Sequence, residues 1–299
     1  MANGLEGLRV IVTAGAGGIG RRIAERFAAA GARVAVCDID EAALADLSAA
    51  SAGIAAAACD VSDSAAVTRW VGAAAEAMGG IDCVVNNAGI AGPTAPIAEV
   101  GDEALHACIA TCLFSQFYVI RAAIAHLRAS PEPSIVNISS VAGKVGFPMR
   151  TPYAAAKWGV IGLTRSLAAE LGPERIRVNA VLPGIVAGDR QRRVLEAKAQ
   201  RLGRSFAEVE AAAFAATAIP DYVTADDVAE QVLFLAGPGA RRITGQALSV
   251  DGDRECAAAD RPPPRSSSRH CRSGTPRPQP IFAHPQGRAE WTAAQRQVP

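Results

Sequence analysis

Short apolar runs rich in β-branched residues alternate with Ala-rich stretches over residues 1–253 of this 299-residue chain. The apolar runs have the length of strands, and the stretches between them have the spacing and length of helices. This alternation predicts an α/β fold, a doubly wound parallel sheet with helices on both faces, since right-handed crossovers join the strands. The expected strands are residues 9–13, 33–38, 54–59, 83–86, 134–139, 177–182 and 247–250, and expected helices include residues 18–30, 65–78 and 153–171.

Residues 188–222 interrupt this rhythm. The segment is charged and helical in pattern, and it follows an expected strand at the edge where doubly wound sheets place their ligands. We predict that it forms a lid over the substrate, and a solvated helical insertion is the alternative.

The composition changes after Asp253. Residues 254–299 are dominated by Pro, Arg and Ser and show no apolar periodicity. Such a segment cannot bury enough surface to offset its ordering entropy, so we predict a single domain over residues 1–253 and a disordered tail after it. A shifted reading frame in the source gene and a genuine extension are both compatible with this tail.

Charge and cysteine usage argue against several classes of protein. The net charge is +1, which gives no whole-protein field that favours nucleic acid or an acidic membrane surface. No apolar run reaches the roughly 18 residues of a transmembrane helix, and the N-terminus lacks a signal-peptide pattern. None of the seven cysteines forms a Cys-x-x-Cys pair, so we expect no metal site and free thiols in a cytoplasmic protein.

A glycine-rich turn joins the first expected strand to the first expected helix. Gly15, Gly17 and Gly20 form a Gly-x-Gly-x-x-Gly pattern. Between a strand and a helix, this pattern lets the backbone approach a pyrophosphate, and the helix offers free N–H groups to it. The turn therefore predicts a Rossmann-type dinucleotide-binding site.

An acidic residue stands where a ribose-binding carboxylate is expected. Asp38 ends the second expected strand, about 20 residues after the turn. A carboxylate there accepts hydrogen bonds from ribose hydroxyls and repels the 2′-phosphate of NADP, so the predicted cofactor is NAD. The turn contains no Arg or Lys, although Arg21 and Arg22 follow it. The alternative is that Asp38 only caps a local turn.

A second constellation carries acid–base chemistry. Tyr153 and Lys157 are four residues apart on an expected helix and so share one face. A free tyrosine has a pKa of about 10 and is a poor base at neutral pH, but a nearby ammonium favours the phenolate. Ser140 follows the preceding strand, where a hydroxyl can hold a substrate oxygen. A surface Tyr and Lys on an amphipathic helix is the alternative interpretation.

These residues resemble the short-chain dehydrogenase/reductase family over about residues 5–253. The family's motifs occur in order and at its usual spacing. They are Thr13, Ala14, Gly18 and Gly20 of the turn, Asp60-Val61, the run Asn86, Asn87, Ala88 and Gly89, then Ser140, Tyr153, Lys157, Pro183-Gly184 and Val186.

The resemblance implies a role for each motif. Tyr153 is the expected general acid/base, Lys157 favours its phenolate and holds the nicotinamide ribose, and Ser140 orients the substrate oxygen. The residues it implies for cofactor binding are Ala14, Gly17, Gly18, Ile19, Gly20, Asp38, Asp60, Val61, Asn87, Ala88, Gly89, Tyr153, Lys157, Pro183, Gly184 and Val186.

Three positions depart from the family pattern. Ala14 replaces the first motif glycine, and the adjacent Gly15 is expected to preserve the flexibility of the turn. Cys112 stands where the family has an asparagine that supports a proton relay, so we expect a slower or differently routed relay. Ala187 and Gly188 follow Val186 where many relatives have a threonine that contacts the carboxamide.

The sequence thus predicts an NAD-dependent oxidoreductase that interconverts a small secondary alcohol and its ketone. The alternatives are a 3-oxoacyl-carrier-protein reductase-like enzyme and an NAD-binding protein with little catalytic activity. Sugars, cyclic alcohols and hydroxy acids all remain open as substrates. Lys144, Arg150 and the lid arginines either meet an anionic or polyhydroxylated substrate or are solvated at the surface. The resemblance also implies a homo-oligomer, a dimer or homotetramer.

Overall fold

The computed structural model describes residues 4–51 and 53–254. Apart from Arg254, the expected tail lies outside the described residues. The N-terminal unit that contains the described residues is an α/β structure, as the alternation of strand and helix patterns predicts.

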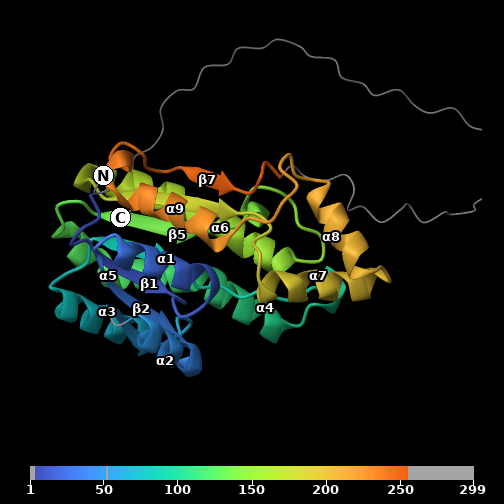
Figure 1. Cartoon of the computed structure of the whole chain (residues 1–299), viewed down its shortest axis with the longest axis horizontal. Helices are drawn as coiled ribbons and strands as arrows, with labels where there is room; N and C mark the ends of the chain where they lie inside the picture. The colour runs from blue at the N-terminus through green and yellow to red at the C-terminus, as the bar shows by residue number, and fades with distance from the viewer. Residues whose placement is uncertain (1–3, 52, 255–299) are drawn as a thin grey trace, which may run out of the picture. The chain divides into compact units, whose positions relative to one another are not determined.

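Seven parallel strands form one sheet in the order β3-β2-β1-β4-β5-β6-β7 (Figure 1). The strands are β1 (Arg9–Thr13), β2 (Arg33–Asp38), β3 (Ile54–Ala58), β4 (Cys83–Asn86), β5 (Ser134–Ile138), β6 (Arg177–Pro183) and β7 (Ala247–Val250). The strand order reverses between β1 and β4. Sheets of this kind open a crevice for ligands at that position, outside the carboxyl ends of the strands.

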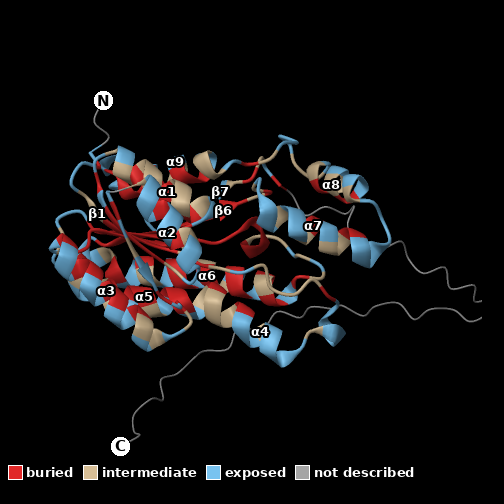
Figure 2. Ribbon diagram, turned by 60° about the horizontal axis from the view of Figure 1, so that its bottom comes forward, coloured by how far each residue is buried: buried red, intermediate tan, exposed pale blue. Residues whose placement is uncertain are grey.

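Two groups of helices cover the two faces of the sheet. The first group is α1 (Gly18–Ala29), α2 (Glu41–Ala50) and α9 (Ala225–Ala236), and the second is α3 (Ser64–Met78), α5 (Ser115–Arg128) and α6 (Thr151–Leu171). Along β1, Val10 and Val12 pack in the core of the first face, while Ile11 packs in the core of the second. Figure 2 shows the consequence: the strands are buried between helices that expose their outer sides.

The predicted strands are all present, and β1, β2, β4 and β7 have the predicted bounds. β3 and β5 end one residue earlier than predicted, and β6 ends one residue later. Two helices begin earlier than predicted, α3 at Ser64 and α6 at Thr151. The start of α3 is fixed by Asp63, whose carboxylate accepts hydrogen bonds from the N–H groups of Ala65 and Ala66.

Hydrogen bonds between buried side chains join β4 and β5 to α6. Asn86 Nδ2 donates to Asn137 Oδ1 at 2.9 Å, and Asn137 Nδ2 donates to Thr164 Oγ1 at 3.0 Å. Thr164 lies two helical turns after Lys157 and therefore on the same face of α6. These hydrogen bonds hold the Lys157 face of the helix against β4 and β5.

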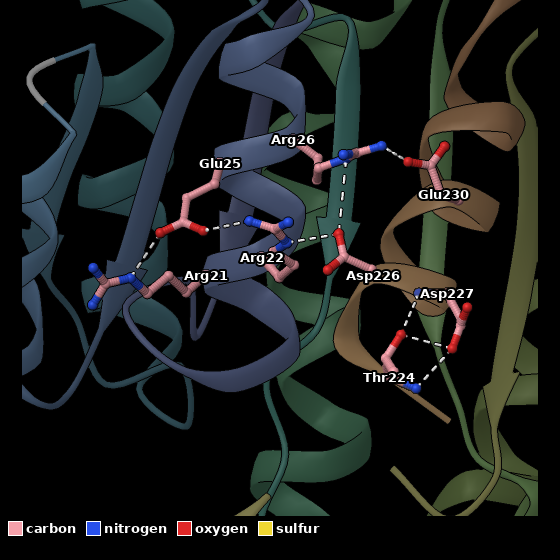
Figure 3. A network of polar contacts seen from close by, with 8 residues as sticks. All are labelled: Arg21, Arg22, Glu25, Arg26, Thr224, Asp226, Asp227 and Glu230. Carbon is pink, nitrogen blue, oxygen red and sulfur yellow. Dashed lines mark hydrogen bonds and ion pairs between the residues drawn. The ribbon is translucent and has the colours of Figure 1, made fainter. Parts of the chain in front are cut away.

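Ion pairs join α1 to α9 (Figure 3). Arg22 Nε lies 2.7 Å from Asp226 Oδ1, and Arg26 pairs with Glu230 one turn further along both helices. Arg21 Nε donates to Glu25 Oε1 at 2.9 Å within α1. Pairs this exposed contribute little to stability, but they give Arg21 and Arg22 acidic partners.

The region Asp102–Arg128 forms one helical run of 27 residues, and an 18-residue window within it has a mean hydropathy of 1.6, so the run is long and apolar enough by length and composition to cross a membrane. It comprises α4 (Asp102–Ile109), a π-helical turn (Ala110–Phe114) and α5. Val119, Ala123 and Leu127 pack in the same core as β4 and β5. The helix is therefore apolar because one of its sides packs in the core of the protein.

Candidate active site at the carboxyl edge of the sheet

A cleft of about 600 Å³ runs along the carboxyl ends of β1, β2, β4, β5 and β6. Its volume lies in the range of cofactor and small-molecule sites. The predicted site residues that line it are Ala14, Gly17, Gly18, Ile19, Asp38, Asn87, Gly89, Ser140, Tyr153, Lys157, Pro183, Gly184 and Val186. The predicted residues that do not line it are Gly20, Asp60, Val61 and Ala88.

The glycine turn presents an open helix N-terminus to this cleft. α1 begins at Gly18 with Gly17 as its N-cap. No side chain forms a capping hydrogen bond there, and the first turn contains no acidic residue. A Cβ atom at Gly17 or Gly18 would meet no atom within 4 Å. The free N–H groups and the empty space suit the pyrophosphate of a dinucleotide, because helix N-termini bind anions.

Ala14 holds the left-handed conformation that the family's glycine would take. Its φ is +50°, while Gly15 is not among the residues with positive φ. The positive φ values of the turn therefore fall on Ala14 and Gly18, not on Gly15. Gly15 instead allows close packing, because a Cβ atom there would lie 2.6 Å from Cβ of Val36. The turn thus keeps its shape with a strained alanine.

Four predicted cofactor contacts do not line the cleft and stay predictions: Gly20, Asp60, Val61 and Ala88. Gly20 packs under the turn, where a Cβ atom would collide with the carbonyl oxygen of Ala14 and the amide of Asn87. The N–H groups of Asn87 and Ala88 both donate to Thr13 Oγ1 at 3.0 Å, which ties β4 to β1.

The two predicted contacts that follow β3 also serve local structure. Asp60 accepts hydrogen bonds from the N–H and hydroxyl groups of Ser62. Val61 packs in the core of the second face.

Asp38 lines the cleft at the end of β2. Its carboxylate accepts hydrogen bonds from the N–H groups of Ala16 at 3.1 Å and Ile39 at 2.8 Å. The carboxylate therefore stands between the glycine turn and the strand end, at the ribose position of the dinucleotide fingerprint. Arg21 and Arg22 do not line the cleft and pair with acids instead.

Ser140, Tyr153 and Lys157 come together in the cleft from two neighbouring segments. Ser140 follows β5, and its hydroxyl caps a short 3₁₀ turn by accepting from the N–H of Ala142. The Lys157 Nζ donates to the carbonyl oxygen of Ile138 at 2.8 Å and lies 5.7 Å from the centre of the Tyr153 ring. Lys157 is buried, and Tyr153 is half-buried.

Two arginines for which the sequence left substrate contact or surface solvation open also face Tyr153. The guanidinium carbons of Arg150 and Arg190 lie 4.6 and 6.0 Å from the centre of the ring. Arg190 Nη1 also donates to the carbonyl oxygen of Gly89 at 3.1 Å. With Lys157, the Tyr153 ring is surrounded by three cations. The sequence signal was the position of Arg150 three residues before Tyr153, at the helix start.

Cys112 lies in the π-helical turn next to Lys157. The Ser115 N–H donates to the carbonyl oxygen of Ala110, five residues back, and this widening is the mark of a π-bulge. The Cys112 Sγ lies 3.4 Å from both the N and the O of Ile90. A hydrogen bond from Cys108, aided by the charge of Lys157, lowers the pKa of Cys112.

The predicted lid consists of α7 (Asp189–Leu202), α8 (Phe206–Phe214) and their connections. Its two ends are joined, since Val223 donates to the carbonyl of Ile185 and Ala187 donates to that of Val223, both at 2.9 Å. Gly188 follows with a φ of +139°, which an L-residue rarely adopts. Residues of α7 line the cleft. The segment has a small apolar cluster of its own, Ile185, Leu195, Ala199, Val209 and Ala213.

Comparison with known proteins places this geometry among oxidoreductases. A family model described as enoyl-(acyl carrier protein) reductase matches residues 14–252. The chain is 36% identical to 2-(S)-hydroxypropyl-CoM dehydrogenase 3 of Xanthobacter autotrophicus, over 84% of this chain and 98% of that protein. It is also 36% identical to L-2,3-butanediol dehydrogenase of Corynebacterium glutamicum, over 81% and 96%.

Solved structures show the same similarity. Levodione reductase superposes with a TM-score of 0.77 at 30% identity and covers 83% of this chain and 97% of its own. A variant of actinorhodin polyketide ketoreductase with NADPH superposes with a TM-score of 0.76 at 36% identity, over 81% and 95%. Both similarities extend over most of the chain.

Proposed function

Because this chain belongs to the short-chain dehydrogenase/reductase family, we propose that it is an NAD-dependent enzyme that interconverts a small secondary alcohol and its ketone. Its relatives are named dehydrogenases and reductases, and the chain is an oxidoreductase of this family. The relatives' names cover diols, a CoM derivative and polyketides, so they select no substrate.

The observation that carries the proposal is the meeting of Ser140, Tyr153 and Lys157 in the cleft that the glycine turn opens. In the oxidative direction, Tyr153 as phenolate would take the proton of the alcohol's hydroxyl group. The hydrogen on the carbon that bears this hydroxyl would leave as a hydride, which the cofactor accepts, as the carbonyl forms. Ser140 orients the substrate oxygen. Lys157, fixed by the Ile138 carbonyl 5.7 Å from the centre of the Tyr153 ring, would hold the nicotinamide ribose.

The residues of the cleft fit a nicotinamide dinucleotide. Gly17, Gly18 and Ile19 would hold its pyrophosphate at the start of α1, and Asp38 would hold the adenosine ribose. The cofactor supplies the hydride acceptor and donor, while the chain supplies position and electrostatics. Asp38 supports NAD over NADP, because its carboxylate would repel the 2′-phosphate of NADP. Arg21 and Arg22, which could bind that phosphate, form ion pairs away from the cleft.

The cofactor preference is tested by comparing kcat/KM for NAD and NADP in the native chain and in an Asp38→Ser/Ile39→Arg variant. Ile39 is 71% exposed beside Asp38, so an arginine there has room to meet a 2′-phosphate. The native chain should favour NAD by about 100-fold, equivalent to one or two lost charge-assisted hydrogen bonds. The variant should favour NADP. A native preference for NADP would contradict the role of Asp38.

A carrier-protein-linked reductase is the second candidate. The description of the matching family model and the similarity to a polyketide ketoreductase favour it. Reduction of an acetoacetyl thioester with NADPH, faster than oxidation of any free alcohol with NAD, would support this candidate over the first.

We also propose that α7 and α8 form a lid that closes on the substrate. The joined ends at Ile185 and Val223, with Gly188 beside them, are the features of a hinged insertion. The family resemblance further suggests a cytoplasmic homo-oligomer, a dimer or tetramer, whose mass light scattering measures directly.

The proposed reaction is tested by following NADH formation with sugars, cyclic alcohols, aliphatic secondary alcohols and hydroxy acids. Tyr153→Phe is the matched control, since it removes only the hydroxyl that takes the proton. Turnover by the native chain and its loss in the variant support the proposal. NAD binding without turnover of any class supports a cofactor-binding protein instead.

A further inference from the structure

Beside Tyr153 lies a buried cation that has no acidic partner. Arg150 directly precedes α6 and is only 7% exposed. Its Nη2 donates to the carbonyl oxygen of Ala91 at 2.6 Å. Its Nε is buried and has no hydrogen-bond partner among the described residues. The side chain lines the cleft, while the Nε atom itself is shielded from solvent.

The neighbours of Arg150 add to its positive charge. Lys157 and Arg190 lie around the same Tyr153 ring, and the other titratable neighbours are the thiols of Cys108 and Cys112. Within residues 4–51 and 53–254, no carboxylate forms an ion pair with Arg150. Burial lowers the pKa of Arg150, because a desolvated guanidinium without a counter-charge is unfavourable.

Three other basic residues of this part of the fold, none of which lines the cleft, do have acidic partners. Lys144 Nζ lies 2.7 Å from Asp251 Oδ2, so the charge of Lys144 is balanced by a carboxylate of the chain itself. On α7, Arg192 pairs with Glu196 at 2.9 Å, and Arg201 pairs with Glu99 at 2.6 Å. Arg150 differs from these residues because its charge is buried and the fold leaves it unpaired.

We propose that Arg150 binds an anionic group of the substrate, so that the substrate is a small hydroxy acid and the product is the corresponding keto acid. This inference rests on the proposed function, since it assigns a substrate class to the same site. A guanidinium offers a planar edge of N–H donors that matches the two oxygens of a carboxylate.

The position of Arg150 limits the size of such a substrate. Its guanidinium lies over the ring of the residue proposed to take the hydroxyl proton, with 4.6 Å between carbon and ring centre. A molecule that contacts both groups must carry its hydroxyl and its carboxylate a few bonds apart. The geometry therefore favours short 2-, 3- or 4-hydroxy acids over long-chain acids.

The experiment compares substrates that differ in charge alone. Initial rates with NAD and with NADP are measured for 2-hydroxybutyrate, 3-hydroxybutyrate and 4-hydroxypentanoate, each beside its primary amide. The proteins are the native chain, Arg150→Met, Arg150→Lys and the control Arg128→Met. Arg128 forms an exposed ion pair with Glu174 and does not line the cleft.

The native chain and the control should favour one carboxylate over its amide by roughly 100-fold in kcat/KM, the effect of a hydrogen-bonded buried charge. Arg150→Met should lose that preference mainly through KM and leave the amide within about threefold. Arg150→Lys should recover part of it. An equal loss for acid and amide in Arg150→Met, with a shifted pH profile, would mean that Arg150 only tunes Tyr153 and would overturn the proposal.

A binding measurement separates this inference from the proposed function. Butyrate and butyramide, which have no reacting hydroxyl, are titrated by calorimetry into the native chain and Arg150→Met, each saturated with NADH. Butyrate binding that Arg150→Met weakens, without turnover of any hydroxy acid, keeps the anion site and contradicts the enzyme. Turnover of amides or neutral alcohols without preference for acids keeps the enzyme and contradicts the anion site.

Discussion

Two buried arginines lie at opposite edges of the sheet. Arg177 begins β6 at the amino edge and donates hydrogen bonds to the carbonyl oxygens of Leu235 and Ala236, at the end of α9. Arg150 lies at the carboxyl edge, where its Nε has no partner. Burial lowers the pKa of both. Cations favour helix C-termini, so the carbonyl groups at the end of α9 satisfy Arg177. Arg150 has neither a carboxylate nor a hydrogen-bond acceptor for its Nε among the described residues.

The same contrast extends to the groups around each arginine. At the amino edge, Asp82 accepts hydrogen bonds from Arg9 Nε at 2.8 Å and from Ser130 Oγ at 2.6 Å. At the carboxyl edge, three cations surround Tyr153 without a carboxylate among them. Asp82 is thus paired with its basic neighbour at the amino edge, whereas the cations around Tyr153 at the carboxyl edge have no acidic partner among the described residues.

The largest expected effect is at the carboxyl edge. Tyr153→Phe removes the proposed general acid/base and should lower kcat by about 1,000-fold, within the usual range for proton-transfer groups. The half-buried ring stays in place, so the free energy of unfolding should change by less than about 1 kcal/mol. Steady-state kinetics and urea unfolding measure both. A variant with native activity would remove Tyr153 from the mechanism.

A smaller effect of the opposite kind is expected at the amino edge. Asp82→Asn should destabilise the fold by about 2 kcal/mol at neutral pH, because Arg9 and Ser130 lose a charged acceptor. kcat should remain within about twofold of native. Burial alone would raise the pKa of Asp82, but the hydrogen bonds from Arg9 and Ser130 outweigh it and lower the pKa.

The pH dependence of this effect follows from the depressed pKa of Asp82. A carboxyl with a lower pKa in the folded state stabilises the fold above its unfolded pKa of about 4 and loses that contribution as the pH falls further. The stability difference between the native chain and Asp82→Asn should therefore shrink below about pH 4. Urea unfolding across the acid range measures it, and a constant difference would exclude the charge as the cause.

Strain at the carboxyl edge should be removable without loss of structure. Ala14→Gly should stabilise the chain by about 1 kcal/mol or slightly less, because glycine adopts the positive φ of this position freely. Thermal unfolding with Ala16→Gly as control measures it, since Ala16 is not among the residues with positive φ. Destabilisation by Ala14→Gly would mean that the turn has another conformation in solution.

The smallest expected effect concerns the relay beside Lys157. Cys112→Asn should raise kcat by about threefold, because an amide makes stronger hydrogen bonds than a thiol to the Ile90 backbone and restores the family residue. The position is buried, so Cys112→Ser is the matched control for a polar group of another shape. An unchanged rate in Cys112→Asn would discard the prediction of a slower relay.

The sequence predicts the strands and the residues that meet in the cleft because local patterns determine them. The β1 strand, the glycine turn and the spacing of Ser140, Tyr153 and Lys157 depend on residues close together in the chain. The use of Asn87 and Ala88 could not be predicted in this way, because their partner Thr13 lies 74 and 75 positions away. Arg150 was considered only as a surface or substrate-facing residue, since its burial depends on Ala91 and Tyr153 packing around it.

The contrast between the two arginines is tested most directly by measuring unfolding and turnover together in Arg177→Met and Arg150→Met. The account predicts that Arg177→Met lowers the free energy of unfolding by about 3 kcal/mol, because two carbonyl groups lose a buried charged donor, while KM is unchanged. Arg150→Met should unfold within about 1 kcal/mol of the native chain and lose its preference for an anionic substrate. Equal destabilisation by both substitutions, with the substrate preference intact in Arg150→Met, would contradict it.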